Sequence, residues 1–179
     1  MIYLVRHGEA AASWGDHPDP GLSELGQKQA EAVADILIEA GASTAVCSPM
    51  LRCRETALPF ERRMGLVAQV APEVSEIDTP QDVEDRVTWL RTLMSGDWDG
   101  GSHDFTAWRT AMLNFVSDLP DETVVFSHFV AINALVGLID KDPRVVVFRP
   151  GHCSVTRFER KNGLLSVAEY GSESATRVL

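Results

Sequence analysis

Short apolar runs alternate with longer amphipathic segments along this chain. The apolar runs have the length of buried strands and fall at residues 2–5, 44–47, 66–70 and 123–127. The segments between them place apolar residues at helical spacing, at 23–40, 50–64, 82–94, 105–119 and 129–139. Ser23 can cap the first helix and Gly41 can end it. Strands that alternate with helices predict an α/β fold, here a three-layer α/β/α sandwich with a mainly parallel sheet.

The last third of the chain is expected to add strands at 144–148, 154–160 and 164–170, and Lys161-Asn162-Gly163 is typical of a hairpin turn between the last two. The two middle helices, 82–94 and 105–119, have no strand between them, only the turn-rich segment 95–101. We therefore expect one domain over residues 1–179, with a small helical cap above the crevice contributed by about residues 73–118.

The first apolar run ends in Arg6, His7 and Gly8. In an α/β fold the carboxyl end of a strand opens onto the ligand crevice. A guanidinium binds phosphate through two charge-assisted hydrogen bonds, and an imidazole can attack phosphorus as a nucleophile. Gly8 would let the backbone come close to a ligand. These three residues alone do not exclude a strand that ends in a surface histidine.

Charge and length limit the kinds of partner. The 179 residues suffice for one domain with a sizeable core. The formal net charge of −10 argues against nucleic acid and anionic membranes as partners. The same charge repels a phosphate ester at long range, so the cations near the crevice, Arg6 and Arg52, carry more weight.

The cellular compartment is expected to be the cytoplasm. The apolar start is five residues long and lacks a basic n-region, so we expect no signal peptide, and no apolar run has membrane-spanning length. Cys47, Cys53 and Cys153 are an odd number without metal-ligand spacing, which favours reduced thiols.

Three further motifs follow Arg6-His7-Gly8: residues 22–30 (LSELGQKQA), 48–57 (SPMLRCRETA) and 124–128 (VVFSH). In this order they resemble the histidine phosphatase superfamily, also called the phosphoglycerate mutase-like family. The resemblance runs from residue 1 to about residue 159 and is loose between residues 73 and 118. It implies phosphoryl transfer through a phosphohistidine, without a cofactor.

The resemblance assigns the main roles of the pocket. His7 is the expected nucleophile, and Arg6 and Arg52 are expected to clamp the phosphoryl oxygens. His128 is expected to hydrogen-bond the phosphoryl group as a charged donor. Phe129 stands where the family usually has glycine, and its backbone N–H can bind phosphate only if ordinary dihedral angles suffice there.

The general acid is expected among the carboxylates after the third strand. Glu76, before Ile77, matches the family's Leu-x-Glu-Ile pattern best, and Asp78 is the alternative. The family's Gly-x-x-Glu-Gly continuation is missing, because residues 79–82 read TPQD.

Further residues are expected around the pocket or in contact with the substrate: Gly8, Glu9, Ser48, Ser127 and His152. Glu9 would orient an arginine or histidine, or have a structural role. We expect no metal site, because two arginines in one pocket repel a cation. Packing or cap roles are expected for the four tryptophans, Trp14, Trp89, Trp98 and Trp108.

The predicted function is hydrolysis of a small phosphorylated metabolite, a phosphomonoester, through a phosphohistidine on His7. A phosphoglycerate mutase-type transfer is the first alternative, although the short middle segment favours hydrolysis. A phosphohistidine-protein phosphatase and a phospho-ligand binding module without turnover are the others. The sequence leaves the substrate open, and it leaves open whether the protein is a homodimer.

Overall fold

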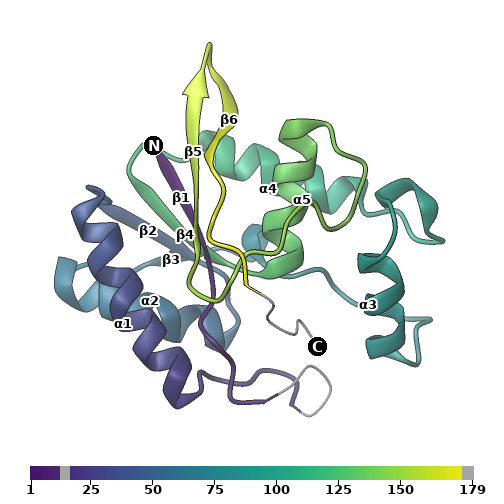
Figure 1. The fold of residues 1–179 in the computed structure, drawn as a ribbon, viewed down its shortest axis with the longest axis horizontal. Coiled ribbons are helices and arrows are strands. Elements are labelled where there is room, and N and C mark those ends of the chain that lie inside the picture. Colours follow the sequence, from purple (N-terminus) through teal and green to yellow (C-terminus); the bar gives the residue numbers. More distant parts are fainter. Residues whose placement is uncertain (13–16, 175–179) are drawn as a thin grey trace.

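The computed structural model describes residues 1–12 and 17–174, and in them one sheet has six strands. The strands are β1 (Ile2–Arg6), β2 (Thr44–Cys47), β3 (Gln69–Val70), β4 (Thr123–Ser127), β5 (Val155–Lys161) and β6 (Leu164–Glu169). Their order across the sheet is β3-β2-β4-β1-β5-β6. Strands β1 to β4 run parallel to one another, β5 pairs antiparallel with β1, and β6 pairs antiparallel with β5 (Figure 1). The predicted α/β fold with a mainly parallel sheet is confirmed.

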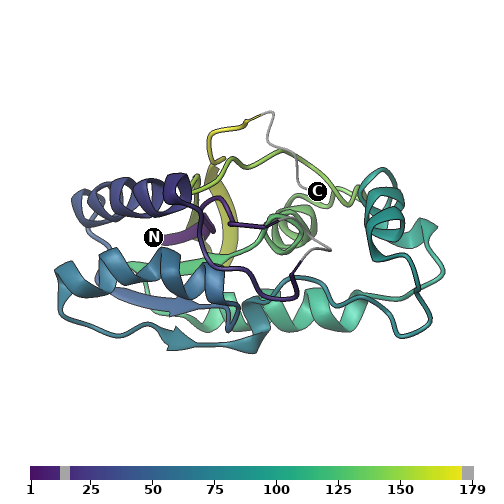
Figure 2. The same cartoon turned by 90° about the horizontal axis from the view of Figure 1, so that it is seen from below.

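Helices cover both faces of the sheet. One face carries α1 (Glu24–Glu39) and α2 (Leu51–Met64), and the other carries α4 (Thr106–Asp118) and α5 (Phe129–Asp140). In Figure 2, α1 and α2 lie together on the left, whereas α4 and α5 lie nearer the centre of the molecule. The remaining helix, α3 (Arg86–Met94), lies farther out, beyond α5. Along the chain it falls between two short 3-10 helices, η1 (Pro72–Val74) and η2 (Trp98–Gly100).

The core is divided by the sheet because neighbouring strand residues point to opposite faces. All five residues of β1 are buried. Tyr3 and Val5 pack with α1 and α2, whereas Ile2 and Leu4 pack with α4 and α5. Burial on both faces explains why β1 reads as a continuous apolar run in the sequence.

The predicted strand 144–148 is wrong, and a helix side chain explains why. Asn133 of α5 is fully buried, and its Oδ1 accepts the backbone N–H groups of Val147 at 2.8 Å and Phe148 at 3.1 Å. The N–H of Val145 binds the carbonyl of Gly96 instead of a strand. The backbone groups that a strand would use are therefore satisfied by Asn133 of α5 and by Gly96 in the loop that follows α3.

Other predicted boundaries shift by a few residues. The strand expected at 66–70 shrinks to β3, and the helix expected from residue 82 begins at Arg86 because Asp85 caps it through the N–H of Thr88 at 3.0 Å. The hairpin turn is confirmed: Asn162 and Gly163 have φ of 54° and 79°, as a two-residue turn with positive φ requires.

The outer helix α3 is attached through a separate apolar cluster. Leu90 of α3 and Trp98 of η2 pack with Phe129 and Val130 of α5, with Trp89 and Trp108 at the edge. Trp14 lies outside the described residues. Met112 and Val116 of α4 pack in the main core, so α4 also belongs to the layer that covers the sheet. The division into one domain with a cap at about 73–118 stays a prediction.

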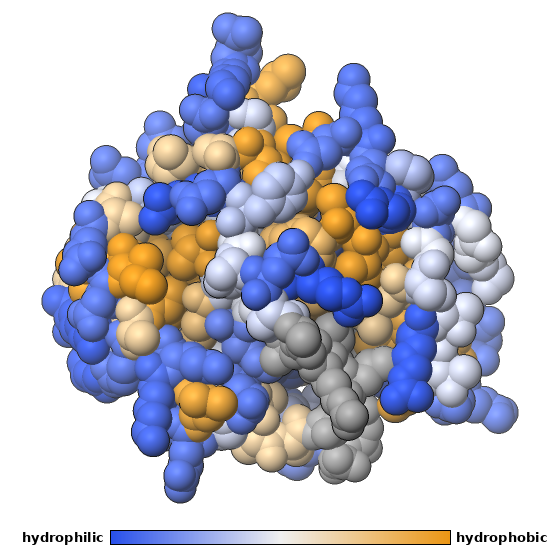
Figure 3. Space-filling view, viewed as in Figure 1, coloured by the Kyte–Doolittle hydropathy of each residue, from blue (hydrophilic) through white to orange (hydrophobic). Residues whose placement is uncertain are grey.

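The surface is mixed in character. On the face in Figure 3, hydrophilic residues lie between separate groups of apolar ones. Among residues 1–12 and 17–174, no helix has the length and apolar character needed to cross a lipid bilayer.

Two glycines bring the start of α1 against the segment that follows His7. A Cβ at Gly8 would lie 2.7 Å from the carbonyl oxygen of Gly26, and a Cβ at Gly26 would lie 2.1 Å from that of Glu9. The side-chain direction of Gly8 thus faces the backbone of α1, and a close approach of the Gly8 backbone to a ligand stays a prediction. Gly26 allows the helix to pack directly on this segment.

Gly26→Ala should therefore destabilise the protein, because backbone must move to admit the methyl group. We expect the free energy of unfolding to fall by about 1–3 kcal/mol, the usual cost of overpacking, as measured by urea denaturation. Gly100→Ala is the matched control, since a Cβ there meets nothing within 4 Å, and it should change stability by less than about 0.5 kcal/mol. Equal stability of the two variants would contradict this packing.

Candidate active site

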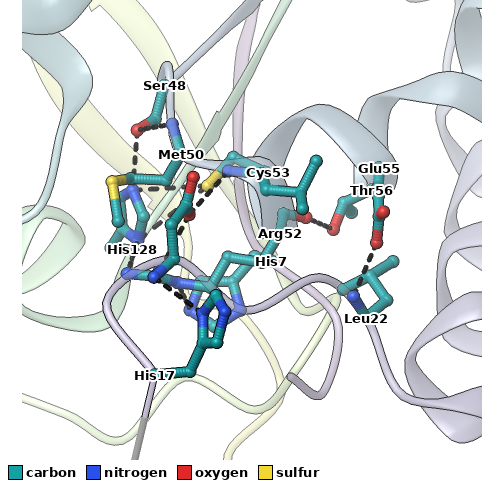
Figure 4. A network of polar contacts seen from close by, with 12 residues as sticks. His7, His17, Leu22, Ser48, Met50, Arg52, Cys53, Glu55, Thr56 and His128 are labelled. Carbon is teal, nitrogen blue, oxygen red and sulfur yellow. Dashed lines mark hydrogen bonds and ion pairs between the residues drawn. The ribbon is translucent and has the colours of Figure 1, made fainter. Parts of the chain in front are cut away.

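Four of the predicted residues meet at the carboxyl end of the sheet. Arg6 and His7 lie at the end of β1, His128 follows β4, and Arg52 is in the first turn of α2. The ring centroids of His7 and His128 are 5.3 Å apart. Arg52 lies between them, with Nε 3.3 Å from His7 Nε2 and Nη2 3.2 Å from His128 Nδ1 (Figure 4). The geometry joins two imidazoles and a guanidinium in one site.

The hydrogen bonds of His7 define its protonation. Its Nδ1 is 2.8 Å from the carbonyl oxygen of Gly8, which can only accept, so Nδ1 carries the hydrogen. Its Nε2 faces the donating Nε of Arg52 and therefore holds a lone pair. Desolvation by burial holds the pKa of His7 well below its ordinary 6.5, and unfavourable electrostatic interactions with His128, Arg52 and Arg6 add to this effect. His7 is thus a neutral imidazole whose Nε2 carries no hydrogen, the form that a nucleophile needs.

His128 is held neutral as well, and its role as a charged donor to a bound phosphoryl group stays a prediction. The residue is fully buried, and burial followed by the charges of Arg52 and Arg6 holds its pKa well below 6.5. Its Nδ1 accepts from Arg52, so the hydrogen is on Nε2, which donates to Ser48 Oγ at 2.8 Å. Cys53 Sγ lies 3.3 Å from the same Nε2.

Arg6 is held at both ends of its guanidinium. The residue is 3% exposed, Nη1 donates to the carbonyl of Pro150 at 2.9 Å, and Nη2 donates to His152 Nε2 at 3.0 Å. Burial lowers the pKa of Arg6 to about 10, so it stays charged at neutral pH. Burial, and then the charge of Arg6, lowers the pKa of His152 to about 4. His152 is therefore a neutral acceptor that orients Arg6, and its ring centroid is 6.0 Å from that of His7.

Glu76 reaches the same site through the amino end of α5. Its Oε2 accepts the N–H of Val130 at 3.1 Å and its Oε1 that of Ala131 at 2.9 Å, directly after His128 and Phe129. Desolvation raises the pKa of Glu76 and outweighs these backbone hydrogen bonds, which lower it. A carboxyl group with a raised pKa suits a proton donor. The alternative, Asp78, is exposed.

The remaining predicted residues bind residues of the site or the backbone next to it. Ser48 binds His128, and the hydroxyl of Ser127 donates to the carbonyl of Val74 at 2.8 Å, which fixes the chain before Glu76. Glu9 accepts the hydroxyl of Ser23 at 2.7 Å, and Ser23 caps α1, so this contact supports the structural role. Phe129 starts α5 with an ordinary helical backbone, so replacing the family's glycine causes no strain there.

Sequence reasoning missed three side chains near the pocket. Asp19 Oδ1 accepts the N–H of Leu51 at 2.9 Å and lies 3.9 Å from Nη1 of Arg52. Thr56 accepts the N–H of Gly8 at 3.0 Å, and its position one helical turn after Arg52 could have indicated it. Arg86, the first residue of α3, has its pKa lowered by burial and then by the charge of Arg52. No spacing in the sequence connects Asp19 or Arg86 with Arg52.

Groups of three or more His, Cys, Asp and Glu side chains that could hold a metal ion are absent from the part of the chain that the structure describes.

Comparisons with known proteins show the family and the fold. The family profile of the histidine phosphatase superfamily (branch 1) matches residues 2–173. The PE-PGRS family protein PE_PGRS11 of Mycobacterium tuberculosis is 39% identical over 83 residues, 43% of this chain. The probable phosphoglycerate mutase GpmB of Escherichia coli is 26% identical over 201 residues, 98% of this chain. A mycobacterial glucosyl-3-phosphoglycerate phosphatase in complex with inorganic phosphate has a TM-score of 0.76 at 22% identity, covering 96% of this chain and 97% of its own.

The matches differ in how much of each protein they include. This chain spans 14% of the length of PE_PGRS11 and 92% of GpmB. The likeness to the solved phosphatase shows a shared fold.

The three neutral histidines should make the protein less stable in acid. In the folded state the pKa values of His7, His128 and His152 lie below the ordinary value near 6.5, so below that pH the unfolded chain binds more protons. Stability should fall as pH drops from about 6.5 towards 4, by about 1.4 kcal/mol per pH unit for each extra proton. Glu76, with its raised pKa, has the opposite sign and offsets one proton.

Urea denaturation at pH 7.5 and 5.5 measures how the free energy of unfolding depends on pH. NMR titration of the imidazole ring protons gives the pKa of each histidine. His152→Asn should reduce the slope by about one proton. A midpoint near pH 6.5 for His7 or His128 would show that these rings are not kept neutral.

Proposed function

The chain belongs to the histidine phosphatase superfamily, and on that basis we propose that it is a phosphomonoesterase that acts through a phosphohistidine on His7. The strongest support is the state of His7. Its Nδ1 is held by the carbonyl of Gly8, its Nε2 keeps a lone pair, and the guanidinium groups of Arg6 and Arg52 lie around it. A neutral nucleophile beside fixed cations is what transfer of a dianionic phosphoryl group requires.

In the first step Nε2 of His7 forms a bond to phosphorus, and the ester P–O bond breaks. Arg6 and Arg52 stabilise the negative charge on the phosphoryl oxygens. Arg52 already donates to both imidazoles, so its N–H groups point into the space between them. The leaving alkoxide takes a proton from Glu76 and departs as an alcohol.

In the second step water attacks phosphorus, and the N–P bond breaks. Glu76, now a carboxylate, takes the proton of the attacking water, and inorganic phosphate and neutral His7 are regenerated. The backbone N–H groups of Val130 and Ala131 stabilise the carboxylate form of Glu76 between the two steps. Glu76 gives the proton of the first step and regains one from water in the second, and Arg6 and Arg52 supply the positive charge, so we propose that no metal or cofactor takes part.

We propose a small phosphorylated metabolite as substrate. The solved phosphatase of the same fold is named for glucosyl-3-phosphoglycerate, which carries a phosphate and an acid group. Arg86 at the start of α3 adds a third cation close to Arg52 on the cap side. Both observations favour a substrate with negative charge beyond its phosphate. A panel of phosphorylated acids, phosphorylated sugars and a phosphohistidine peptide tests this choice.

Mutase activity is the second candidate because GpmB is similar over 98% of this chain. A mutase would return the phosphoryl group to a second hydroxyl of the substrate instead of to water. Measuring isomerised product and inorganic phosphate in the same reaction separates the two. We further propose that residues 1–179 form one domain with a cap at about 73–118, of which α3 is the outermost part. The cytoplasmic location and the homodimer stay predictions.

His7→Ala should lower kcat on 4-nitrophenyl phosphate by several orders of magnitude, because it removes the covalent route. Wild-type protein given a labelled phosphate ester should acquire acid-labile, base-stable label, and the variant should not. His103→Ala, which changes a cap histidine paired with Asp82, is the control and should keep wild-type turnover. Equal labelling of His7→Ala, or loss of wild-type activity in EDTA with recovery on one divalent metal, would contradict the proposal.

Glu76→Gln should distinguish poor from good leaving groups. We expect a decrease of about 10²–10⁴-fold on alkyl phosphates, the usual range for general acid catalysis, and a far smaller one on 4-nitrophenyl phosphate. Asp78→Asn is the matched control and should have little effect. If both variants keep wild-type rates on the best alkyl substrate, Glu76 is not the acid, and a phosphohistidine-protein phosphatase becomes the preferred function.

A further inference from the structure

The side chain of Phe129 lies against Arg6. The Cζ of Arg6 is 5.1 Å from the centroid of the Phe129 ring, within the distance of a cation–π contact. Phe129 is 2% exposed and Arg6 is 3% exposed, so water does not screen the contact. A glycine at position 129 would have no ring to pack on this side of the guanidinium.

The other contacts of Arg6 lie at the edge of its guanidinium plane. Nη1 binds the carbonyl of Pro150 and Nη2 binds His152. Among the described residues, Nε of Arg6 is buried without a hydrogen-bond partner. These two hydrogen bonds fix the positions of Nη1 and Nη2. The tilt of the guanidinium plane then depends on the group that packs against its face. The Phe129 ring packs on that face.

The ring is itself held in place. Phe129 belongs to a buried cluster with Ile77, which follows Glu76, and with Leu90 of α3. Its backbone is the first residue of α5, directly after His128. The position of the Phe129 ring is therefore set by the segment that carries Glu76 and by the start of α5, which directly follows His128.

We propose that Phe129 is a positioning residue that sets the plane of Arg6 and so directs its free N–H groups at the phosphoryl oxygens. This inference rests on the proposed function, because it concerns the role of Arg6 in phosphoryl binding. The aromatic ring of Phe129 would thus support one of the two arginines.

A double-mutant cycle between Phe129→Leu and Arg6→Gln tests the coupling. Phe129→Leu should lower kcat/KM for 4-nitrophenyl phosphate about 5- to 30-fold and weaken inhibition by vanadate by a similar factor, as loss of a cation–π contact implies. In the Arg6→Gln background the same change should cost less than about twofold, because the cation is gone. Phe129→Tyr, which keeps the ring, should restore most of the wild-type value.

Phe158→Leu is the control, because Phe158 is also fully buried but pairs with Ile2 at the far end of β1. It should lower stability without changing kcat/KM or vanadate inhibition. Equal losses for Phe129→Leu in both Arg6 backgrounds, or no loss in either, would overturn the inference. If Phe129→Leu does not fold, Phe129→Met takes its place in the cycle.

Failure of the inference and failure of the proposed function give different results. If wild-type protein neither hydrolyses phosphate esters nor binds vanadate, the proposed function fails. If wild type does both and the cycle shows no coupling, only the role of Phe129 fails.

Discussion

The site depends on the parallel pairing of β1 with β4. In this register Arg6 lies opposite Ser127, and the N–H of His7 donates to the carbonyl of Ser127 at 3.0 Å. The residues that follow the two strands are therefore delivered side by side, His7 from one and His128 from the other. Helix α2, which begins after the neighbouring strand β2, brings Arg52 between them. A shift of one residue in this pairing would turn one of these side chains to the other face of the sheet.

The amino end of α5 is the second organising feature. Within its first residues, the helix follows His128, presents the ring of Phe129 to Arg6 and binds the carboxyl group of Glu76 through two N–H groups. The helix end favours a negative charge, whereas burial disfavours it. Burial outweighs the helix end, so the pKa of Glu76 is raised, which is the direction that a proton donor requires.

The sequence predicted the parts of the molecule that depend on local pattern. The apolar runs of β1, β2 and β4 identify buried strands, and Ser23 caps α1 as expected because its hydroxyl accepts the N–H of Gly26. The strand at 144–148 failed because its N–H groups are taken by Asn133, a residue of another element whose role no local pattern shows. The neutral state of His128 and the contact of Phe129 with Arg6 depend on distant residues meeting in space, and so they escape a reading of spacing alone.

The pocket holds two neutral imidazoles beside two guanidinium groups, and this links anion binding to proton uptake. The nearby positive charges contribute to holding the pKa values of His7 and His128 low. An anion bound among the arginines offsets those charges, so the free-energy cost of protonating an imidazole falls once the anion is present. His128, with Nδ1 facing Arg52, can then gain a hydrogen and donate to the anion. Association of a phosphate would therefore draw protons from the buffer, and the charge on His128 would come with the ligand instead of preceding it.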